Sequence, residues 1–259
     1  MNVVVIGAGL GGLSAAAHLV KRGHEVTVIE RESVPGGRAG VVAERGFRLD
    51  NGPTVMTMPE LLGDVFAAAG AEMRDWVTIK KVDPMYRAVY ADGSELRVLH
   101  GREAMAEEIR RFSDAGEAAS FLKFCEWLDG LYRAEMNSFI DANFDSPLDL
   151  VKPWRDGLAL VRMGAFRKLD STIGRFFRDE RLQRIFSFQS MYAGLAPYEA
   201  LSLYAVITYM DSVQGVYFPE GACTRWRLVS PARWKRRGCS SAMSRRSPAS
   251  CAPPAVAVP

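Results

Sequence analysis

Hydrophobic positions at the start of the chain form two short runs on either side of a helical pattern. Residues 3–6 are all β-branched, which favours a buried strand. Residues 24–30, HEVTVIE, follow the helix-stop signal Arg22-Gly23 and are predicted as a second strand. The apolar residues between the two runs recur at helical spacing: Leu13, Ala16, Ala17 and Val20. The order strand, helix, strand predicts a βαβ unit.

Helical spacing dominates the middle of the chain. We predict helices over 60–71, 102–112 and 117–136, and a β-hairpin over 87–99 that turns at Asp92-Gly93. Residues 46–53 supply a short strand and a tight turn. In the longest helix the apolar side chains fall on one face and are predicted to be core: Phe121, Phe124, Leu128 and Leu131.

Glycines interrupt the pattern where the first strand meets the first helix. Gly7, Gly9 and Gly12 fit the spacing G-x-G-x-x-G. Gly7 permits the tight turn, Gly9 lets the backbone approach a pyrophosphate, and Gly12 lets the helix pack closely on the strand. The phosphates are expected on the free N–H groups at the positive end of the helix. The motif predicts a dinucleotide site.

Glu30 ends the second strand, at the position where an acid accepts hydrogen bonds from an adenosine ribose. A carboxylate there repels a 2′-phosphate, which favours FAD or NAD over NADP. A glycine-rich turn in an unrelated βαβ unit is the alternative interpretation.

Composition places the chain among ordinary globular proteins. Of its 259 residues 48% are hydrophobic and 24% charged. No apolar run reaches about 18 residues, and the first strand starts too early for a cleaved signal peptide, so a cytoplasmic location is expected. The four cysteines contain no C-x-x-C pair, which gives no support for a zinc site or a disulfide framework.

The net charge of +3 depends on the last residues. Residues 222–259 hold eight Lys or Arg and no Asp or Glu, which leaves 25 basic against 30 acidic residues in the preceding part. A nucleic-acid partner is therefore not expected.

Two further motifs follow the second strand. Gly36-Gly37-Arg38 brings backbone N–H groups and a guanidinium together, and Asp50-Asn51-Gly52-Pro53 forms a turn. With the G-x-G-x-x-G turn and the acid, these motifs resemble the N-terminus of the flavin-containing amine oxidase and phytoene desaturase superfamily. The resemblance implies FAD as cofactor and a contact between the GGR loop and FAD.

Residues 151–186 hold nine Lys or Arg and four Asp or Glu, with apolar and aromatic residues between them. Such a pattern suits a peripheral membrane surface, and equally suits core-facing helices with a solvated basic side. Residues 186–221 resemble the bacterial phytoene desaturase branch, in which a Phe-Gln-Ser-x-Tyr stretch, a Pro-Tyr-Glu-Ala helix start and a Gly-Val-x-Phe-Pro strand occur in this order. The resemblance implies a lipid-soluble polyene such as phytoene as substrate, and it favours peripheral membrane association.

The resemblance stops after residue 221. Residues 222–259 lack an amphipathic period and are rich in Arg, Ser, Pro and Ala, so we expect a disordered tail. Ala222–Arg227 is also the out-of-frame translation of a DNA stretch that encodes Gly-Met-His-Ala-Val-Ala, the family's continuation. We therefore hypothesise a one-base slip near codon 221, which sequencing of the coding DNA tests. The family's remaining chain completes the flavin domain, so the protein is expected to be truncated and aggregation-prone.

These observations predict an α/β fold: a doubly wound, incomplete Rossmann-like FAD-binding domain at 1–75, then an α+β, mainly helical substrate or membrane domain at 76–221. The function implied is an FAD-dependent oxidoreductase of carotenoid biosynthesis that removes hydrogen from a polyene. The alternatives are a non-catalytic fragment and an amine or protoporphyrinogen oxidase-like enzyme, whereas an NAD-linked dehydrogenase leaves the GGR and D-x-G-P elements without a role.

The expected cofactor-binding residues come from the four motifs and their flanks: Gly7, Ala8, Gly9, Gly11, Gly12, Glu30, Arg31, Gly37, Arg38, Asp50, Gly52 and Pro53. The catalytic base is not identified, and four acids stay unranked as candidates: Asp149, Asp170, Glu180 and Glu199. The three histidines are expected to be exposed: His18, His24 and His100.

Overall fold

The computed structural model divides the chain into two compact units. One comprises Met1–Lys81 and Tyr217–Pro259, and the other comprises Val82–Val216. The residues described are 1–259 without 33, 51, 144, 147–148, 150–152, 221–238, 241–256 and 259. The expected division into a cofactor domain and a substrate domain at residues 75/76 stays a prediction.

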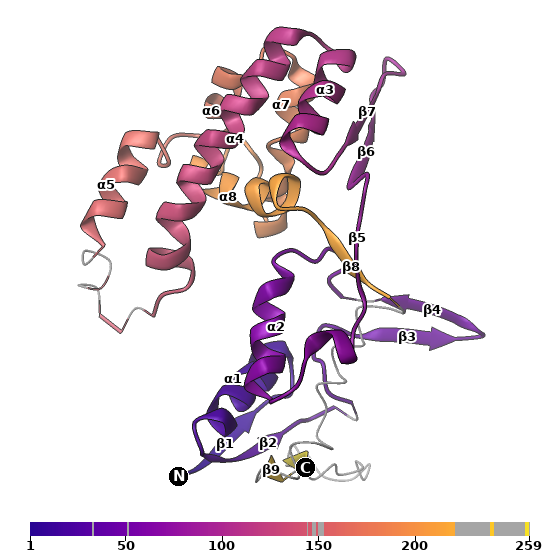
Figure 1. The fold of residues 1–259 in the computed structure, drawn as a ribbon, viewed down its shortest axis with the longest axis vertical. Helices are drawn as coiled ribbons and strands as arrows, with labels where there is room; N and C mark the ends of the chain where they lie inside the picture. Colours follow the sequence, from indigo (N-terminus) through magenta and orange to yellow (C-terminus); the bar gives the residue numbers. More distant parts are fainter. Residues whose placement is uncertain are drawn as a thin grey trace. The chain divides into compact units, whose positions relative to one another are not determined.

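The first unit opens with the predicted βαβ arrangement (Figure 1). β1 (Asn2–Ile6) and β2 (Glu25–Ile29) pair in parallel along their whole lengths. α1 (Leu10–Lys21) connects them, and it ends where Gly23 takes a φ of +84°. The prediction of strand, helix and strand is confirmed.

Two very short strands extend this sheet from the C-terminal segment. β9 (Cys239–Ser240) pairs with β2 in parallel, and β10 (Ala257–Val258) pairs with β2 antiparallel. The rest of the expected disordered tail lies outside the described residues.

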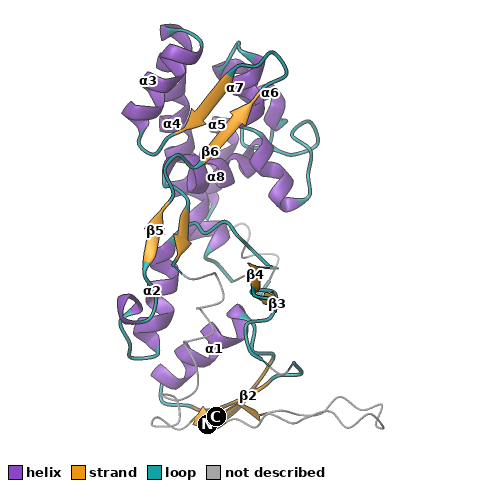
Figure 2. Cartoon of the chain, turned by 90° about the vertical axis from the view of Figure 1, so that its right-hand side faces the viewer, coloured by secondary structure: helices purple, strands orange, loops and turns teal. Residues whose placement is uncertain are grey.

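The remainder of the first unit consists of short elements that follow β2. The strands β3 and β4 form a hairpin, and β5 pairs antiparallel with β8 (Figure 2). The bounds are β3 (Val41–Glu44), β4 (Phe47–Asp50), α2 (Pro59–Ala68), the 3₁₀ helix η1 (Met73–Asp75), β5 (Ile79–Lys81) and β8 (Tyr217–Pro219).

The core of the first unit lies between the sheet and α1 and α2. Ala16 and Ala17 of α1 and Phe66 of α2 are buried there with Val26 and Val28 of β2. Alanine on the packed face of α1 lets the helix lie close to the strands. This close packing holds the start of α1, and with it the glycine motif, in place.

The second unit starts with the predicted hairpin. β6 (Tyr86–Val89) and β7 (Glu95–Val98) pair antiparallel, and the turn contains Gly93 with a φ of +80°. α3 (Arg102–Phe112) and α4 (Ala115–Glu135) then lie side by side, as Figures 1 and 2 show. Asp114 caps α4 by accepting the N–H of Glu117 at 2.8 Å.

Aromatic side chains form the centre of the second unit. Phe121, Phe124, Leu128 and Leu131 of α4 are all buried, which confirms the predicted core face. Phe124 contacts the rings of Phe176, Phe177 and Phe186 at centroid distances of 5.2, 5.3 and 5.7 Å. Phe177 and Phe186 therefore pack the core, so for these two side chains of the basic stretch the core-facing alternative is confirmed.

Shorter helices complete the second unit. Their bounds are the π-helical η2 (Met136–Ile140), α5 (Trp154–Met163), α6 (Leu169–Phe176), α7 (Glu180–Ile185), the 3₁₀ helices η4 (Phe188–Ala193) and η5 (Ser202–Tyr204), α8 (Ala205–Thr208) and the π-helical η6 (Tyr209–Val213). Across the described residues, no helix has both the length and the apolar character needed to cross a bilayer.

Candidate functional site

The G-x-G-x-x-G turn connects β1 to α1. Gly7 has a φ of +97°, and its N–H donates to the carbonyl oxygen of Ile29 at 2.6 Å. A Cβ on Gly12 would lie 2.0 Å from the carbonyl oxygen of Gly7. The absence of a side chain at these two positions lets the chain reverse tightly and lets α1 start directly against the end of β1.

The start of α1 has the properties of an anion site. Among the described residues no side chain caps the helix, and its first turn contains no acidic residue. The first N–H groups of a helix have no acceptor within the helix, and the helix dipole makes this end positive. A Cβ on Gly11 meets no atom within 4 Å, so the space in front of these N–H groups is open.

The GGR loop lies directly against this turn. The N–H of Gly36 donates to the carbonyl oxygen of Ala8 at 2.7 Å, and a Cβ on Gly37 would lie 3.0 Å from the Cα of Gly9. A Cβ on Gly52 would in turn lie 1.9 Å from the carbonyl oxygen of Arg38. Three motifs that are separate in the sequence therefore meet at one place, through backbone contacts that only glycine allows.

The Glu30 carboxylate lies beneath the turn and is 8% exposed. Its Oε2 accepts the N–H of Ala8 at 2.5 Å, and its Oε1 accepts the N–H of Glu32 at 2.9 Å. Each carboxylate oxygen has a second lone pair, so Glu30 orients the turn and still has acceptor capacity for a ligand hydroxyl.

The other predicted site residues lie around the glycine turn, and most of them are exposed. Arg31 is exposed and pairs with Glu32 at 3.0 Å, while Arg38 and Pro53 are exposed beside the glycine contacts. Asp50 ends β4. Asn51 of the same turn lies outside the described residues.

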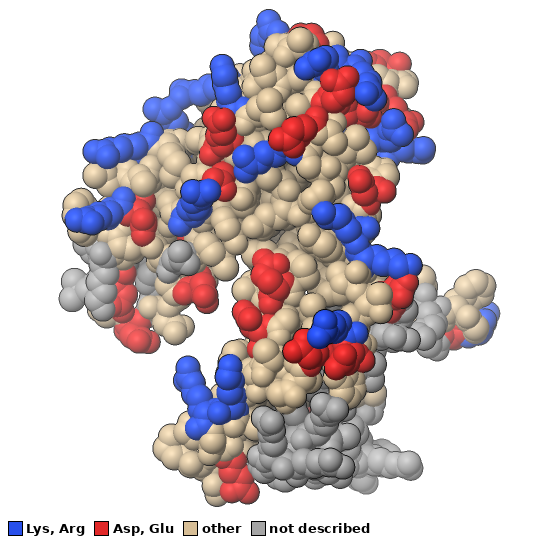
Figure 3. Space-filling view, in the orientation of Figure 1, with Lys and Arg blue, Asp and Glu red and all other residues tan. Residues whose placement is uncertain are grey.

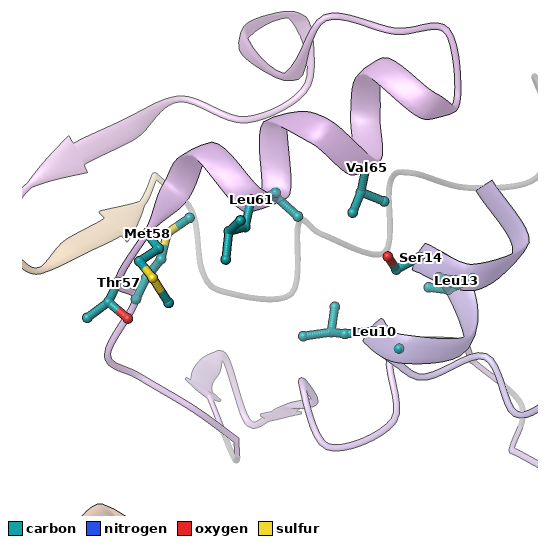
Figure 4. A pocket seen from close by; sticks show the side chains of 10 residues that line it. Leu10, Leu13, Ser14, Thr57, Met58, Leu61 and Val65 are labelled. Carbon is teal, nitrogen blue, oxygen red and sulfur yellow. The ribbon is translucent and has the colours of Figure 1, made fainter. Parts of the chain in front are cut away.

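An apolar cavity of about 330 Å³ opens between α1 and α2 (Figure 4). Leu10 and Leu13 of α1 face Leu61 and Val65 of α2 across it. Sequence analysis did not predict this cavity, because the residues that line it have the spacing of ordinary core positions on two separate helices.

The second unit holds buried acids that sequence analysis also missed. Asp211 is fully buried, and burial raises the pKa of its carboxyl to about 7. Burial likewise raises the pKa of Glu135 to about 8. Of the four acids considered from the sequence, Asp170, Glu180 and Glu199 are exposed and Asp149 is half-buried. The only sequence signal for Asp211 was a single acid within an apolar run.

The histidines do not converge on a site. His18 is exposed as expected. His24 and His100 are half-buried, so the expectation of exposure is wrong for them. The backbone of each is held by a hydrogen bond: the N–H of His24 donates to the carbonyl oxygen of Leu19, and the N–H of His100 donates to the side-chain carboxylate of Asp83.

Residues 10–246 match the family described as flavin containing amine oxidoreductase. The chain belongs to this family. Members of this family are flavoproteins, which confirms the predicted FAD cofactor, and the open glycine turn and the buried acid of this structure fit the group.

Several curated proteins are similar to this chain. It is 53% identical over 220 residues to the phytoene dehydrogenase of Streptomyces griseus, covering 85% of this chain and 43% of that protein. It is 34% identical over 220 residues to the zeta-carotene-forming phytoene desaturase of Myxococcus xanthus, covering 85% of this chain and 42% of that protein. The chain thus spans less than half the length of these relatives.

Solved structures show the same fold. An oxidoreductase from Methanosarcina mazei aligns with a TM-score of 0.53 at 23% identity, and a putrescine oxidase aligns with a TM-score of 0.54 at 17% identity. Each alignment covers 92% of this chain and about half of the other protein. The Rossmann-like assignment of the first unit is consistent with these neighbours.

Proposed function

We propose that the protein is an FAD-dependent, phytoene desaturase-like oxidoreductase of carotenoid biosynthesis, acting on a lipid-soluble polyene such as phytoene. The observation that carries the proposal is the 53% identity to a phytoene dehydrogenase over 220 residues of a chain that also holds all four cofactor motifs. The reaction class is removal of hydrogen from a C–C single bond to give a double bond.

Different residues around the glycine turn would bind different parts of FAD. The N–H groups at the start of α1 would bind the pyrophosphate, with Gly7, Ala8, Gly9, Gly11 and Gly12 leaving room for it. Glu30 would accept hydrogen bonds from the ribose. The backbone N–H groups of Gly37 and Arg38 would contact the flavin part of FAD, and the close approach of Gly52 to Arg38 would hold this loop in place.

The bound flavin supplies the redox chemistry, because it accepts a hydride and so both electrons of a C–H bond. The protein's own tasks are to bind the cofactor, to exclude water, and to take up the proton that the polyene also releases.

We propose a peripheral membrane surface on α5 as the route by which a lipid-soluble substrate arrives. Trp154, Leu158 and Val161 follow each other at helical spacing and are exposed. Arg155 and Arg162 of the same helix are also exposed, and Figure 3 shows basic side chains along α5. An apolar stripe between basic side chains suits an anionic bilayer surface.

The first experiment is the visible absorption spectrum of the purified chain with and without added FAD. A bound flavin band that is reduced anaerobically by phytoene in liposomes supports the proposed enzyme. A bound flavin that phytoene does not reduce supports the alternative of a non-catalytic fragment.

The membrane surface is tested separately by flotation with anionic vesicles. We expect Trp154→Ser with Leu158→Ser and Val161→Ser to lose vesicle binding, while Val89→Ser, at an exposed position on β6, keeps it. Equal flotation of the two variants contradicts the surface on α5.

A further inference from the structure

The apolar cavity between α1 and α2 has no role in the proposed function. All of its lining residues belong to the first unit, and none of the described residues that line it is charged. Ser14 and Thr57 contribute hydroxyl groups, whereas leucine, methionine and valine side chains make up most of the wall (Figure 4). Leu10 and Leu61 are 41% and 43% exposed, so the cavity is open to solvent along this edge. Its volume of about 330 Å³ falls within the range of small-molecule sites.

One end of the cavity coincides with the start of α1. Leu10 and Gly11 line the cavity and are also the first two residues of this 12-residue helix. Among the described residues no side chain caps this end, and the helix dipole makes it positive. Apolar space therefore begins where the first N–H groups of the helix attract an anion. This combination of charge and apolar surface is complementary to one kind of molecule, in which an anionic head carries an apolar chain.

The wall opposite α1 contains a residue in an unfavourable conformation. Met58 lines the cavity and precedes Pro59 at the start of α2, with a φ of +49° and a ψ of +58°. Residues other than glycine rarely adopt this left-handed region, because the Cβ is crowded there. Residues of this kind persist where the surrounding structure imposes them, and they gather at ligand sites. Met58 is thus an indication, independent of the charge, that this cavity binds a ligand.

FAD is not the best occupant of this space. On each side of its pyrophosphate FAD carries a group rich in hydroxyls, the adenosine ribose or the ribityl chain, and the apolar wall offers these groups few hydrogen bonds. A hydrocarbon chain attached directly to the diphosphate needs no hydrogen bonds, and it removes both its own apolar surface and that of the wall from water. The chemistry of the wall therefore favours an alkyl or prenyl diphosphate.

We propose that the cavity and the start of α1 form one site for a molecule in which a diphosphate is attached directly to a long apolar chain. The diphosphate accepts hydrogen bonds from the first N–H groups of α1, and the chain lies between Leu13 of α1 and Leu61 and Val65 of α2. FAD needs the same N–H groups for its pyrophosphate, so the two ligands exclude each other. The competition rests on the proposed function, because it requires that FAD binds at this turn. The fraction of the chain that holds FAD then falls as the diphosphate accumulates.

Binding is tested first without FAD, by isothermal titration calorimetry of the 259-residue chain with farnesyl diphosphate. Inorganic pyrophosphate lacks the chain, farnesol lacks the head, and geranyl diphosphate has a chain that is shorter by a single isoprene unit. We expect farnesyl diphosphate to bind at least tenfold more tightly than each of these three ligands, because every buried CH₂ group strengthens binding about fourfold. An affinity equal to that of any of the three overturns the proposal.

Substitutions in the wall test where the chain lies. Met58→Gln with Leu61→Gln makes the wall polar at two partly exposed positions, so the fold tolerates the change. Ala15→Gln with Ala67→Gln is the matched control, because these alanines are exposed on α1 and α2 and do not line the cavity. We expect the first pair to weaken farnesyl diphosphate binding at least tenfold and to keep pyrophosphate binding within twofold of the parent chain. Equal affinities of the two double variants for farnesyl diphosphate overturn the proposal.

The competition is tested by flavin fluorescence titration in the presence of farnesyl diphosphate. We expect the apparent Kd of the parent chain for FAD to rise in proportion to the farnesyl diphosphate concentration, and that of the variant with Met58→Gln and Leu61→Gln to rise at least tenfold less. If this variant loses affinity for FAD and for farnesyl diphosphate equally, the cavity holds part of FAD and the proposal is wrong. An FAD affinity that farnesyl diphosphate does not change also overturns it. If the parent chain binds no FAD, the proposed function fails, whereas calorimetry with farnesyl diphosphate still decides whether the cavity is a site.

Discussion

The glycines of the nucleotide motif have two different physical roles. Gly12 and Gly52 face backbone atoms at distances that no Cβ tolerates, so they are required for the fold. A Cβ on Gly11 meets no atom within 4 Å, and a Cβ on Gly9 lies 3.9 Å from the Cα of Gly37, an ordinary contact distance. A side chain at either position is therefore tolerated by the fold and enters the volume expected for the cofactor. Substitutions at the two kinds of glycine should therefore affect different properties.

We predict that Gly9→Val weakens FAD binding at least tenfold and changes the free energy of unfolding by no more than about 1 kcal/mol, the order of a poorer N-cap. Gly12→Ala should instead destabilise the first unit, because its Cβ overlaps the Gly7 carbonyl oxygen. Flavin fluorescence titration and urea unfolding measure the two effects, with Gly63→Ala, at a glycine of α2 whose Cβ position has no atom within 4 Å, as the control for both. Unchanged FAD affinity in Gly9→Val contradicts the placement of the pyrophosphate.

Glu30 is expected to matter for both folding and binding. Its carboxylate holds the N–H groups of Ala8 and Glu32, so Glu30→Ala loses those two hydrogen bonds as well as those to the ribose. At about 1 kcal/mol for each hydrogen bond, the thermal midpoint should fall even without FAD. Calorimetry of the cofactor-free chain checks this. The thermal midpoint of Glu30→Gln, which retains one acceptor oxygen, should lie between those of the parent chain and Glu30→Ala. An unchanged midpoint in Glu30→Ala contradicts the role in folding.

The buried Glu135 makes stability depend on pH. Burial raises its pKa from 4.5 to about 8, so the folded state holds a proton that the unfolded state has lost between these values. The contribution of Glu135 to the free energy of unfolding therefore falls as the pH rises from about 4.5 to 8, and it is constant above that range. We predict that Glu135→Gln raises the thermal midpoint more at pH 9 than at pH 5. An equal change of the thermal midpoint at pH 9 and pH 5 contradicts a raised pKa for Glu135.

At the scale of elements, α4 organises the second unit. Its buried face meets rings from α6, from Phe177 just beyond α6, and from Phe186 just beyond α7, and Phe124 is fully buried among them. The short helices α6 and α7 have too few residues to be stable alone, so their structure depends on this contact.

We predict that Phe124→Ala lowers the free energy of unfolding by about 3–5 kcal/mol, the range for removal of a fully buried aromatic ring. Leu122→Ala, at a partly exposed position on the same helix, should cost far less. Urea unfolding followed by circular dichroism compares the two variants. Equal losses would place the core on a different face of α4.

At the scale of the whole molecule, β1 carries exposed apolar side chains on one face of the parallel β1–β2 pair. Val4 and Ile6 alternate on β1 and are 59% and 85% exposed, whereas Val3 and Val5 are partly buried. Strands of parallel sheets are normally covered on both faces. An exposed apolar face of this kind promotes self-association.

We predict that Val4→Thr with Ile6→Thr raises the soluble fraction of the chain and reduces light scattering on warming. The matched pair Val3→Thr with Val5→Thr, on the packed face, should lower the thermal midpoint. If the first pair lowers stability and leaves scattering unchanged, the exposed face is not the source of association.

Local pattern was sufficient for most elements of this protein. The spacing of apolar residues predicted β1, α1, the β6–β7 hairpin, α3 and the core face of α4, because those signals depend on residues only a few positions apart. The four cofactor motifs could also be predicted from the sequence, since each needs particular residues at a fixed spacing. They led to the flavin family, which the comparisons then showed.

Only the tertiary structure decided which side chains are buried and which residues meet. Phe177 and Phe186 pair with α4 although their own stretch is basic and amphipathic, and Asp211 meets Tyr86 from 125 positions away. The contacts of Gly37 with Gly9 and of Gly52 with Arg38 likewise join separate loops. The sequence by itself determined the elements and the family, whereas burial and proton chemistry depend on contacts between distant residues that no local pattern encodes.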